Sequence, residues 1–187
     1  AAVSAGVAFV VNTLLGMGIY IFTNSDAITE LATGSVVAPP VEETLKGLAV
    51  LIVFLFFRHE FDSILDGIVY AGITALGFAA TENAYYIYNY GYLEGGYEGL
   101  FALVFIRVIL VGWQHPFYTA FLGIGLAAAR LTKSTGLKLI YPILGWAMAV
   151  GTHALHNTLA GLLEGLGGLA ISTAVDWSGW LFMFGLI

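Results

Sequence analysis

The sequence lacks cysteine and has few charged side chains. Because cysteine is absent, disulfides and thiolate metal sites are excluded from this chain. Only 10% of the 187 residues are charged, whereas soluble domains carry about 25%. Lys and Arg together number six and the net charge is −6. These few basic residues form no extended patch, so no nucleic-acid partner is expected.

Long apolar runs take the place of polar surface. Hydrophobic residues make up 59% of the sequence. A helix needs about 20 mostly apolar residues to cross a bilayer, whereas a membrane β-barrel would show short alternating segments. We therefore predict an all-α fold, a polytopic transmembrane helical bundle that forms a single integral membrane domain over residues 1–187 in the lipid bilayer. The six expected spans cover residues 3–23, 38–57, 63–90, 98–130, 138–164 and 166–187.

Two of these spans are less regular than the others. Residues 98–130 are long for one crossing, and Pro116 inside them should kink the helix. The alternative is a surface helix followed by a shorter span. The last span contains Asp176. In the third span, small residues at helical spacing, among them Gly67 and Ala71, predict close packing against a neighbouring helix.

The charges between the spans predict an orientation. Arg58 and His59 follow the second span, and Arg130 and Lys133 follow the fourth. With six spans these loops share a side, which the positive-inside rule makes cytoplasmic. The loops on the opposite side are acidic. We expect a multi-pass protein with both termini in the cytoplasm.

A small set of polar residues lies inside the predicted spans. An ionisable side chain there costs several kcal/mol unless it is paired or faces water, so each is a functional hypothesis. The set comprises Glu42, Glu43, Lys46, Glu82, Asn83, Arg107, His115, His153, His156 and Asn157. Their expected depths overlap in the outer half of the bundle. We predict that four helices bring them to one water-containing cavity.

Helical spacing refines this picture. Glu42 and Glu43 point about 100° apart, and Lys46 is within reach of both. One glutamate can therefore pair with Lys46 while the other faces the cavity. The alternative is a simple ion pair at the start of a helix. His153 and Asn157 are four residues apart and share a face.

Two further side chains have structural interpretations. His156 is interpreted as an interhelical hydrogen-bond partner, which is common for a histidine in a membrane helix. Arg107 either pairs with a carboxylate or extends towards the lipid headgroups.

The polar set is suited to hydrolysis. Two histidines and a carboxylate are enough to hold zinc with one open position, and a second carboxylate can act as general base. Without a metal, a desolvated glutamate can still activate water with help from histidine. An asparagine amide near the attacked carbonyl could stabilise the oxyanion.

Four segments resemble a known family. The segments APPVEETLKG, DSILDGIVYAGITALGFAATENAYY, RVILVGWQHPFYTAFLGIG and HALHN follow the order and spacing of PrsW-family intramembrane proteases, within the CAAX prenyl endopeptidase and bacteriocin-processing (CPBP) superfamily. The resemblance covers a protease-like core of about residues 36–165. It implies cleavage of peptide bonds in or near a prokaryotic plasma membrane, with a membrane-anchored substrate such as an anti-sigma factor.

The resemblance also implies the site residues. The family pattern falls on Glu42, Glu43, Glu82, His115 and His153, with Asn157 at the polar position after the last histidine. We expect Glu43 to act as general base while Glu42 assists or pairs with Lys46. Zinc is expected on Glu82, His115 and His153, and Asn157 is expected to polarise the scissile carbonyl.

Several alternatives stay open from sequence alone. The base could be either Glu42 or Glu43, and catalysis could use zinc or glutamate without a metal. His156 stands where an aromatic is expected and adds a spare ligand. A proton- or cation-coupled transporter also uses membrane carboxylates and histidines. A non-catalytic immunity or scaffold protein could share the same fold.

Overall fold

The computed structural model describes residues 2–163 and 165–186, which form helices and turns with no strand among them. The helices are α1 (Ala2–Thr23), α2 (Asp26–Ala32), η1 (Thr33–Val37), α3 (Ala38–Phe56), η2 (Arg58–Glu60), α4 (Ile64–Tyr86), η3 (Ile87–Tyr92), α5 (Leu93–Val104), η4 (Phe105–Leu110), α6 (Gln114–Leu131), α7 (Thr135–Leu163) and α8 (Gly165–Leu186). The all-α prediction is confirmed, and every predicted span coincides with at least one helix. The short helix α2 and the π-helical turn η1 were not predicted.

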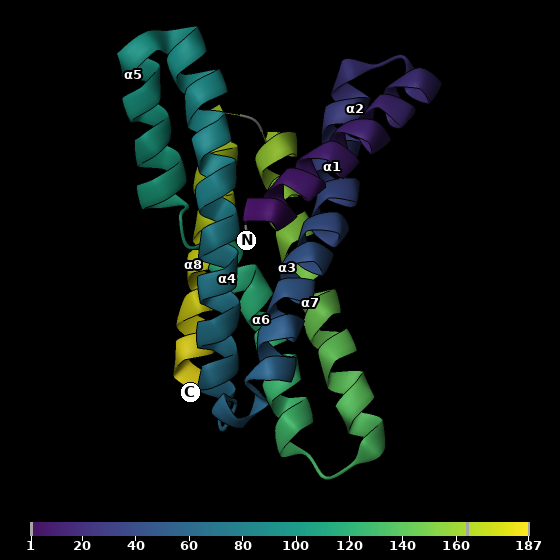
Figure 1. Cartoon of the computed structure of the whole chain (residues 1–187). Coiled ribbons are helices and arrows are strands. Elements are labelled where there is room, and N and C mark those ends of the chain that lie inside the picture. Colours follow the sequence, from purple (N-terminus) through teal and green to yellow (C-terminus); the bar gives the residue numbers. More distant parts are fainter. Residues whose placement is uncertain (1, 164, 187) are drawn as a thin grey trace.

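Fewer stretches qualify as membrane spans than form helices. Two stretches are long and apolar enough to cross a membrane by length and composition, namely α1 and Ile64–Leu131. The predicted count of six spans is therefore not confirmed. The second stretch includes a reversal of the chain at Gly96, whose φ of 59° is a conformation that glycine adopts without strain (Figure 1).

The predicted fourth span is broken, but not at Pro116. Helices α5 and η4 end at Leu110, and α6 starts at Gln114, so the break falls at residues 111–113. Pro116 lies in the first turn of α6. A proline is tolerated there because the amides of the first helical turn have no intrahelical acceptor. The predicted kink at Pro116 is thus wrong in position, and the proline starts a helix instead.

Small residues bring α4 and α6 into backbone contact. A methyl group added at Gly67 would collide with the carbonyl oxygen of Gly123, and one added at Gly123 would collide with that of Gly67. Ala71 and Ala75 on the same face of α4 are fully buried. The predicted seam of small residues is confirmed, and it sets the distance between the two helices that carry Glu82 and His115.

The two basic loops meet at one end of the molecule. Arg130 Nε donates a hydrogen bond to the carbonyl oxygen of Arg58, at 3.0 Å. The turn at the start of α5, which contains Gly96, lies at the opposite end of the bundle (Figure 1). The prediction that the loops after the second and fourth spans share a side is therefore confirmed. Which side of a membrane they face stays a prediction.

Candidate active site

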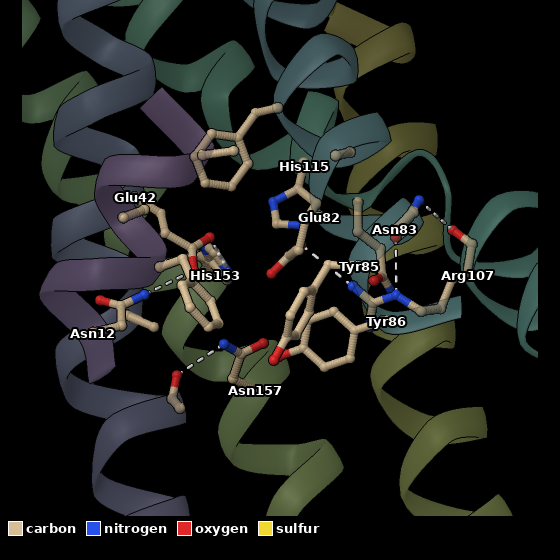
Figure 2. Close-up of a pocket in the computed structure, with 18 of the residues that line it drawn as sticks. Asn12, Glu42, Glu82, Asn83, Tyr85, Tyr86, Arg107, His115, His153 and Asn157 are labelled. Carbon is tan, nitrogen blue, oxygen red and sulfur yellow. Dashed lines mark hydrogen bonds and ion pairs between the residues drawn. The ribbon is translucent and has the colours of Figure 1, made fainter. Parts of the chain in front are cut away.

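A cavity of about 960 Å³ opens inside the bundle, lined by residues of α1, α3, α4, α6 and α7 (Figure 2). Five of the six predicted site residues line it: Glu42, Glu82, His115, His153 and Asn157. The structure therefore brings side chains from four helices into one space, as the sequence predicted. Glu43 is the sixth, and it is not among the residues that line the cavity.

Glu43 lies behind the cavity wall and is fully buried. Its Oε1 lies 2.6 Å from Lys46 Nζ and 3.0 Å from His153 Nδ1. Its Oε2 accepts a hydrogen bond from Thr119 Oγ1 at 2.8 Å. Both oxygens are thus occupied by protein groups. This geometry differs from the expected role of Glu43 as general base, because neither oxygen is directed to the space where water would react.

Glu42 takes the position that was expected of Glu43. Its Oε1 accepts a hydrogen bond from Asn12 Nδ2 at 3.3 Å. Its Oε2 is buried and has no hydrogen-bond partner in the described part of the chain. Lys46 Nζ lies 3.6 Å from this oxygen and His153 Nε2 lies 4.0 Å from it. Of the two glutamates, Glu43 is thus the closer partner of Lys46, and Glu42 faces the cavity.

His115 links α3 to α4. Its Nδ1 lies 2.8 Å from Lys46 Nζ, and its Nε2 lies 2.9 Å from Glu82 Oε2. An ammonium group can only donate, so Nδ1 accepts and Nε2 carries the proton towards Glu82. These two contacts fix the orientation of the ring between an amine and a carboxylate.

Arg107 holds the other side of Glu82. Its guanidinium donates to Glu82 Oε2 at 3.3 Å and to Asn83 Oδ1 at 2.9 Å, and it lies 4.1 Å from the ring centre of Tyr86. Of the two alternatives for Arg107, pairing with a carboxylate is therefore confirmed. The guanidinium fixes one oxygen of Glu82 beside the cavity (Figure 2).

Asn157 and His156 extend the polar lining along α7. Asn157 Nδ2 donates to the carbonyl oxygen of Gly34 at 2.8 Å and so ties α7 to η1. Its predicted contact with a scissile carbonyl stays a prediction. His156 Nδ1 lies 2.7 Å from Asp176 Oδ2 on α8, which confirms the interhelical hydrogen bond expected for this histidine.

Three of the cavity residues could hold one metal ion. Ligand atoms of Glu42, His115 and His153 all lie within 4.8 Å of one another. Zinc bonds to nitrogen and oxygen are about 2.0–2.2 Å, so two ligands of one tetrahedral zinc lie about 3.4 Å apart. The 4.0 Å between Glu42 Oε2 and His153 Nε2 would therefore shorten by about half an ångström when an ion binds.

The contacts around this trio also suit a metal. Glu43 occupies Nδ1 of His153 and leaves its Nε2 towards the cavity, which is the carboxylate–histidine arrangement of zinc sites. The unpartnered Oε2 of Glu42 is a vacant acceptor that a cation would satisfy. The trio contains Glu42 where Glu82 was expected. Glu82 instead forms a hydrogen bond with His115.

Sequence reasoning missed several residues that shape the site. Asn12 on α1 holds Glu42, Thr119 on α6 holds Glu43, and the ring of Tyr118 stacks on His153 with centroids 4.7 Å apart. Thr119 follows His115 by four residues and so shares its helix face. This spacing could have identified Thr119 as a site residue from the sequence. Asn12 is a single amide in an apolar span, and nothing local indicates its partner thirty positions away.

Comparison with known proteins agrees with this geometry. The chain matches the profile described as PrsW family intramembrane metalloprotease over residues 1–187. A protein named Protease PrsW from Geobacillus kaustophilus is 31% identical over 109 residues, which cover 54% of this chain and 44% of that protein. Another Protease PrsW, from Oceanobacillus iheyensis, is 31% identical over 108 residues, covering 57% of this chain and 45% of the relative.

These alignments cover less than half the length of either curated relative. No solved structure shows significant similarity to the chain. The family profile nevertheless extends over the whole sequence, and its metalloprotease description agrees with a glutamate and two histidines around one cavity. The chain therefore belongs to the PrsW family of intramembrane metalloproteases.

Proposed function

We propose that this protein is an endopeptidase that hydrolyses a peptide bond of a membrane-anchored protein inside the cavity. The observation that carries the proposal is the grouping of Glu42, His115 and His153 around a space large enough for an extended peptide segment. An anti-sigma factor is the substrate that the sequence resemblance suggests. The basic loops are proposed to face the cytoplasm, on the positive-inside rule.

A zinc ion would be held by Glu42, His115 and His153. When bound, zinc supplies a positive charge that polarises a carbonyl and makes a water molecule acidic at neutral pH. The excess of carboxylates over basic groups around the cavity also favours the binding of a cation. Three carboxylates, on Glu42, Glu43 and Glu82, surround two basic groups, on Lys46 and Arg107.

Glu82 is proposed to accept the proton of the attacking water. Its Oε2 is fixed by Arg107 and His115, while Oε1 is left for water, and the side chain is 21% exposed in the cavity. A carboxylate held in one orientation beside the reacting atoms is what general-base catalysis requires. In this assignment Glu82 changes from the expected ligand to the base, and Glu42 becomes the ligand.

Glu43 and Lys46 are proposed to position the histidines. Glu43 fixes the tautomer of His153 through Nδ1, and Lys46 occupies Nδ1 of His115. His153 is thereby left with Nε2 towards the reacting groups. Binding of a metal to His115 Nε2 would replace its hydrogen bond to Glu82 and move the ring proton to Nδ1. Asn157 stays a candidate for the oxyanion, because its amide has a second N–H besides the one bound to Gly34.

The test is cleavage of single-span peptides by the purified protein in liposomes, with the cut sites read by mass spectrometry. Wild-type protein should cleave, and Glu42→Gln and His153→Ala should lose at least about 100-fold in rate. His59→Gln is the matched control, because the His59 side chain is 69% exposed and is not among the residues that line the cavity. Cleavage by the two cavity variants at the wild-type rate would contradict the proposal.

A further inference from the structure

The cavity contains a second polar pair that the roles above leave unused. His156 of α7 lines the cavity, and its Nδ1 lies 2.7 Å from Asp176 Oδ2 of α8. Asp176 is only 2% exposed, and its Oδ2 also accepts a hydrogen bond from Tyr118 Oη at 3.2 Å. A carboxylate in the middle of an apolar helix is costly, so its position against a cavity histidine needs a reason.

The pair is oriented towards the cavity by its hydrogen bonds. Asp176 Oδ2 lies 2.7 Å from Nδ1 of the His156 ring. Gln114 Nε2 lies 3.3 Å from the same nitrogen, but it is itself a donor and makes no hydrogen bond to a protonated Nδ1. A carboxylate at this distance accepts the Nδ1 proton. Within the described residues Nε2 makes no hydrogen bond, and the side chain is 12% exposed. The second nitrogen is thus the part of the ring that can meet a substrate.

His156 also lies beside the proposed reacting groups. It follows His153 by three residues on α7, which places the two Cβ atoms about 5–6 Å apart on one face. Tyr118 stacks on His153 and lies 6.0 Å from the His156 ring, centroid to centroid. Gln114, the neighbour of His115 in sequence, contacts His156 from α6. His156 is nevertheless outside the trio that could hold a metal.

We propose that His156, held by Asp176, is the general acid that protonates the leaving amine. The inference rests on the proposed endopeptidase function and adds a catalytic residue to it. Asp176 is a positioning residue: it binds Nδ1–H, balances the positive charge of the doubly protonated ring and directs Nε2–H into the cavity.

The proton balance of the step closes without another reactant. As the water oxygen adds to the carbonyl carbon, Glu82 takes one water proton. When the carbon–nitrogen bond breaks, its electron pair goes to nitrogen, which takes the Nε2 proton of His156. The proton on Glu82 then returns to His156 through cavity water. One water and one peptide bond become one carboxylic acid and one amine.

Two simpler arrangements compete with this assignment. The pair could be only a link between α7 and α8, in which case its loss would affect folding and every substrate alike. Glu82 could also return its own proton to the amine, in which case His156 would not matter for the rate. A substrate whose leaving group needs no proton separates these arrangements from the proposed one.

The experiment uses two matched substrates and the full chain in liposomes. The first is a single-span peptide that wild-type protein cleaves at a mapped bond. The second is the same peptide with that amide replaced by an ester, whose alkoxide leaves with far less need for an acid. His156→Gln should lower kcat on the amide by about 100-fold or more, with KM nearly unchanged, and lower kcat on the ester by less than about 5-fold.

The partner residue and a control complete the design. Asp176→Asn should show the same selective loss on the amide, and the double variant should be no slower than His156→Gln, because the two residues act as one unit. His59→Gln should cleave both substrates normally. Retained ester cleavage by His156→Gln also reports that this variant folds.

Each result decides the matter. An equal loss on both substrates, or no loss on the amide, would overturn the role of His156 and leave the endopeptidase function standing. If wild-type protein cleaves no single-span peptide, or if Glu42→Gln and His153→Ala cleave both substrates normally, the proposed function itself fails and the role of His156 fails with it.

Discussion

Glu43 Oε1 lies 3.0 Å from Nδ1 of His153, although the two residues are 110 positions apart in the chain. The same oxygen lies 2.6 Å from Lys46 Nζ. A single carboxylate oxygen therefore joins α3 to α7 and neutralises a buried ammonium. The adjacent Glu42 has an oxygen with no such partner in the described structure. Neighbouring residues on a helix point about 100° apart, so the two consecutive glutamates contact different groups.

The first prediction separates these two glutamates. Glu43→Gln should lower the free energy of unfolding by about 3–5 kcal/mol, because it breaks a buried pair and leaves Lys46 uncompensated. Glu42→Gln should cost about 1 kcal/mol or less, because Lys46 keeps Glu43 as its partner. Cleavage should be lost in Glu42→Gln even though the protein is folded. Unfolding in detergent and cleavage in liposomes measure the two effects, and the opposite ranking of stability would reject this division.

The second prediction concerns the metal. Purified wild-type protein should contain about one zinc per chain, and a chelator should stop cleavage until zinc is restored. Substitution of Glu42, His115 or His153 by Ala should remove the metal. Glu82→Ala should keep the metal and lose cleavage, because Glu82 is assigned as the base.

Metal content by mass spectrometry checks this set independently of activity. His59→Gln is again the control variant, because its exposed ring lies outside the trio. Loss of zinc in Glu82→Ala together with retention in Glu42→Ala would restore the ligand set expected from sequence. A metal-free, chelator-resistant wild-type enzyme would instead make Glu42 the base.

The third prediction tests the contact between α4 and α6. Gly67→Ala should destabilise the protein by about 1–3 kcal/mol, because the added methyl group would meet the backbone of Gly123. Cleavage should fall as well, since this contact sets the spacing of Glu82 and His115. Gly18→Ala on α1 is the matched control, because a Cβ there meets no atom within 4 Å and alanine favours a helix. Equal stability of the two variants would show that the helices can separate at little cost.

Much of the fold was predictable from sequence because apolar runs and their charged ends are local signals. The limits of α1 and α3 agree with the predicted spans to within one residue. The break before α6 was misplaced, because a proline interrupts only the middle of a helix and no local signal marks where the new helix starts. The reversal at Gly96 falls within the glycine-rich segment between the third and fourth predicted spans.

The sequence predicted which residues form the site, but it did not predict the role of each residue within it. The polar residues of four spans do meet, because unpaired charges inside a bundle have to find one another or water. Whether Glu42 or Glu43 faces the cavity depends on the rotation of α3, which tertiary packing sets. Asp176 was taken as an irregularity of the last span, and its partner His156 could be identified only once α7 and α8 were placed side by side.

The last prediction tests the orientation in the membrane, and the absence of cysteine makes the test direct. Single cysteines can be placed without background at Lys133, in the turn before α7, and at Glu94, near the reversal at Gly96. The hydrogen bond between Arg130 and Arg58 places the basic loops at one end, so the positive-inside rule puts Lys133→Cys in the cytoplasm and Glu94→Cys outside. A membrane-impermeant maleimide added to intact cells should therefore label only Glu94→Cys, and both positions should react after lysis. Labelling of Lys133→Cys in intact cells would reverse the orientation.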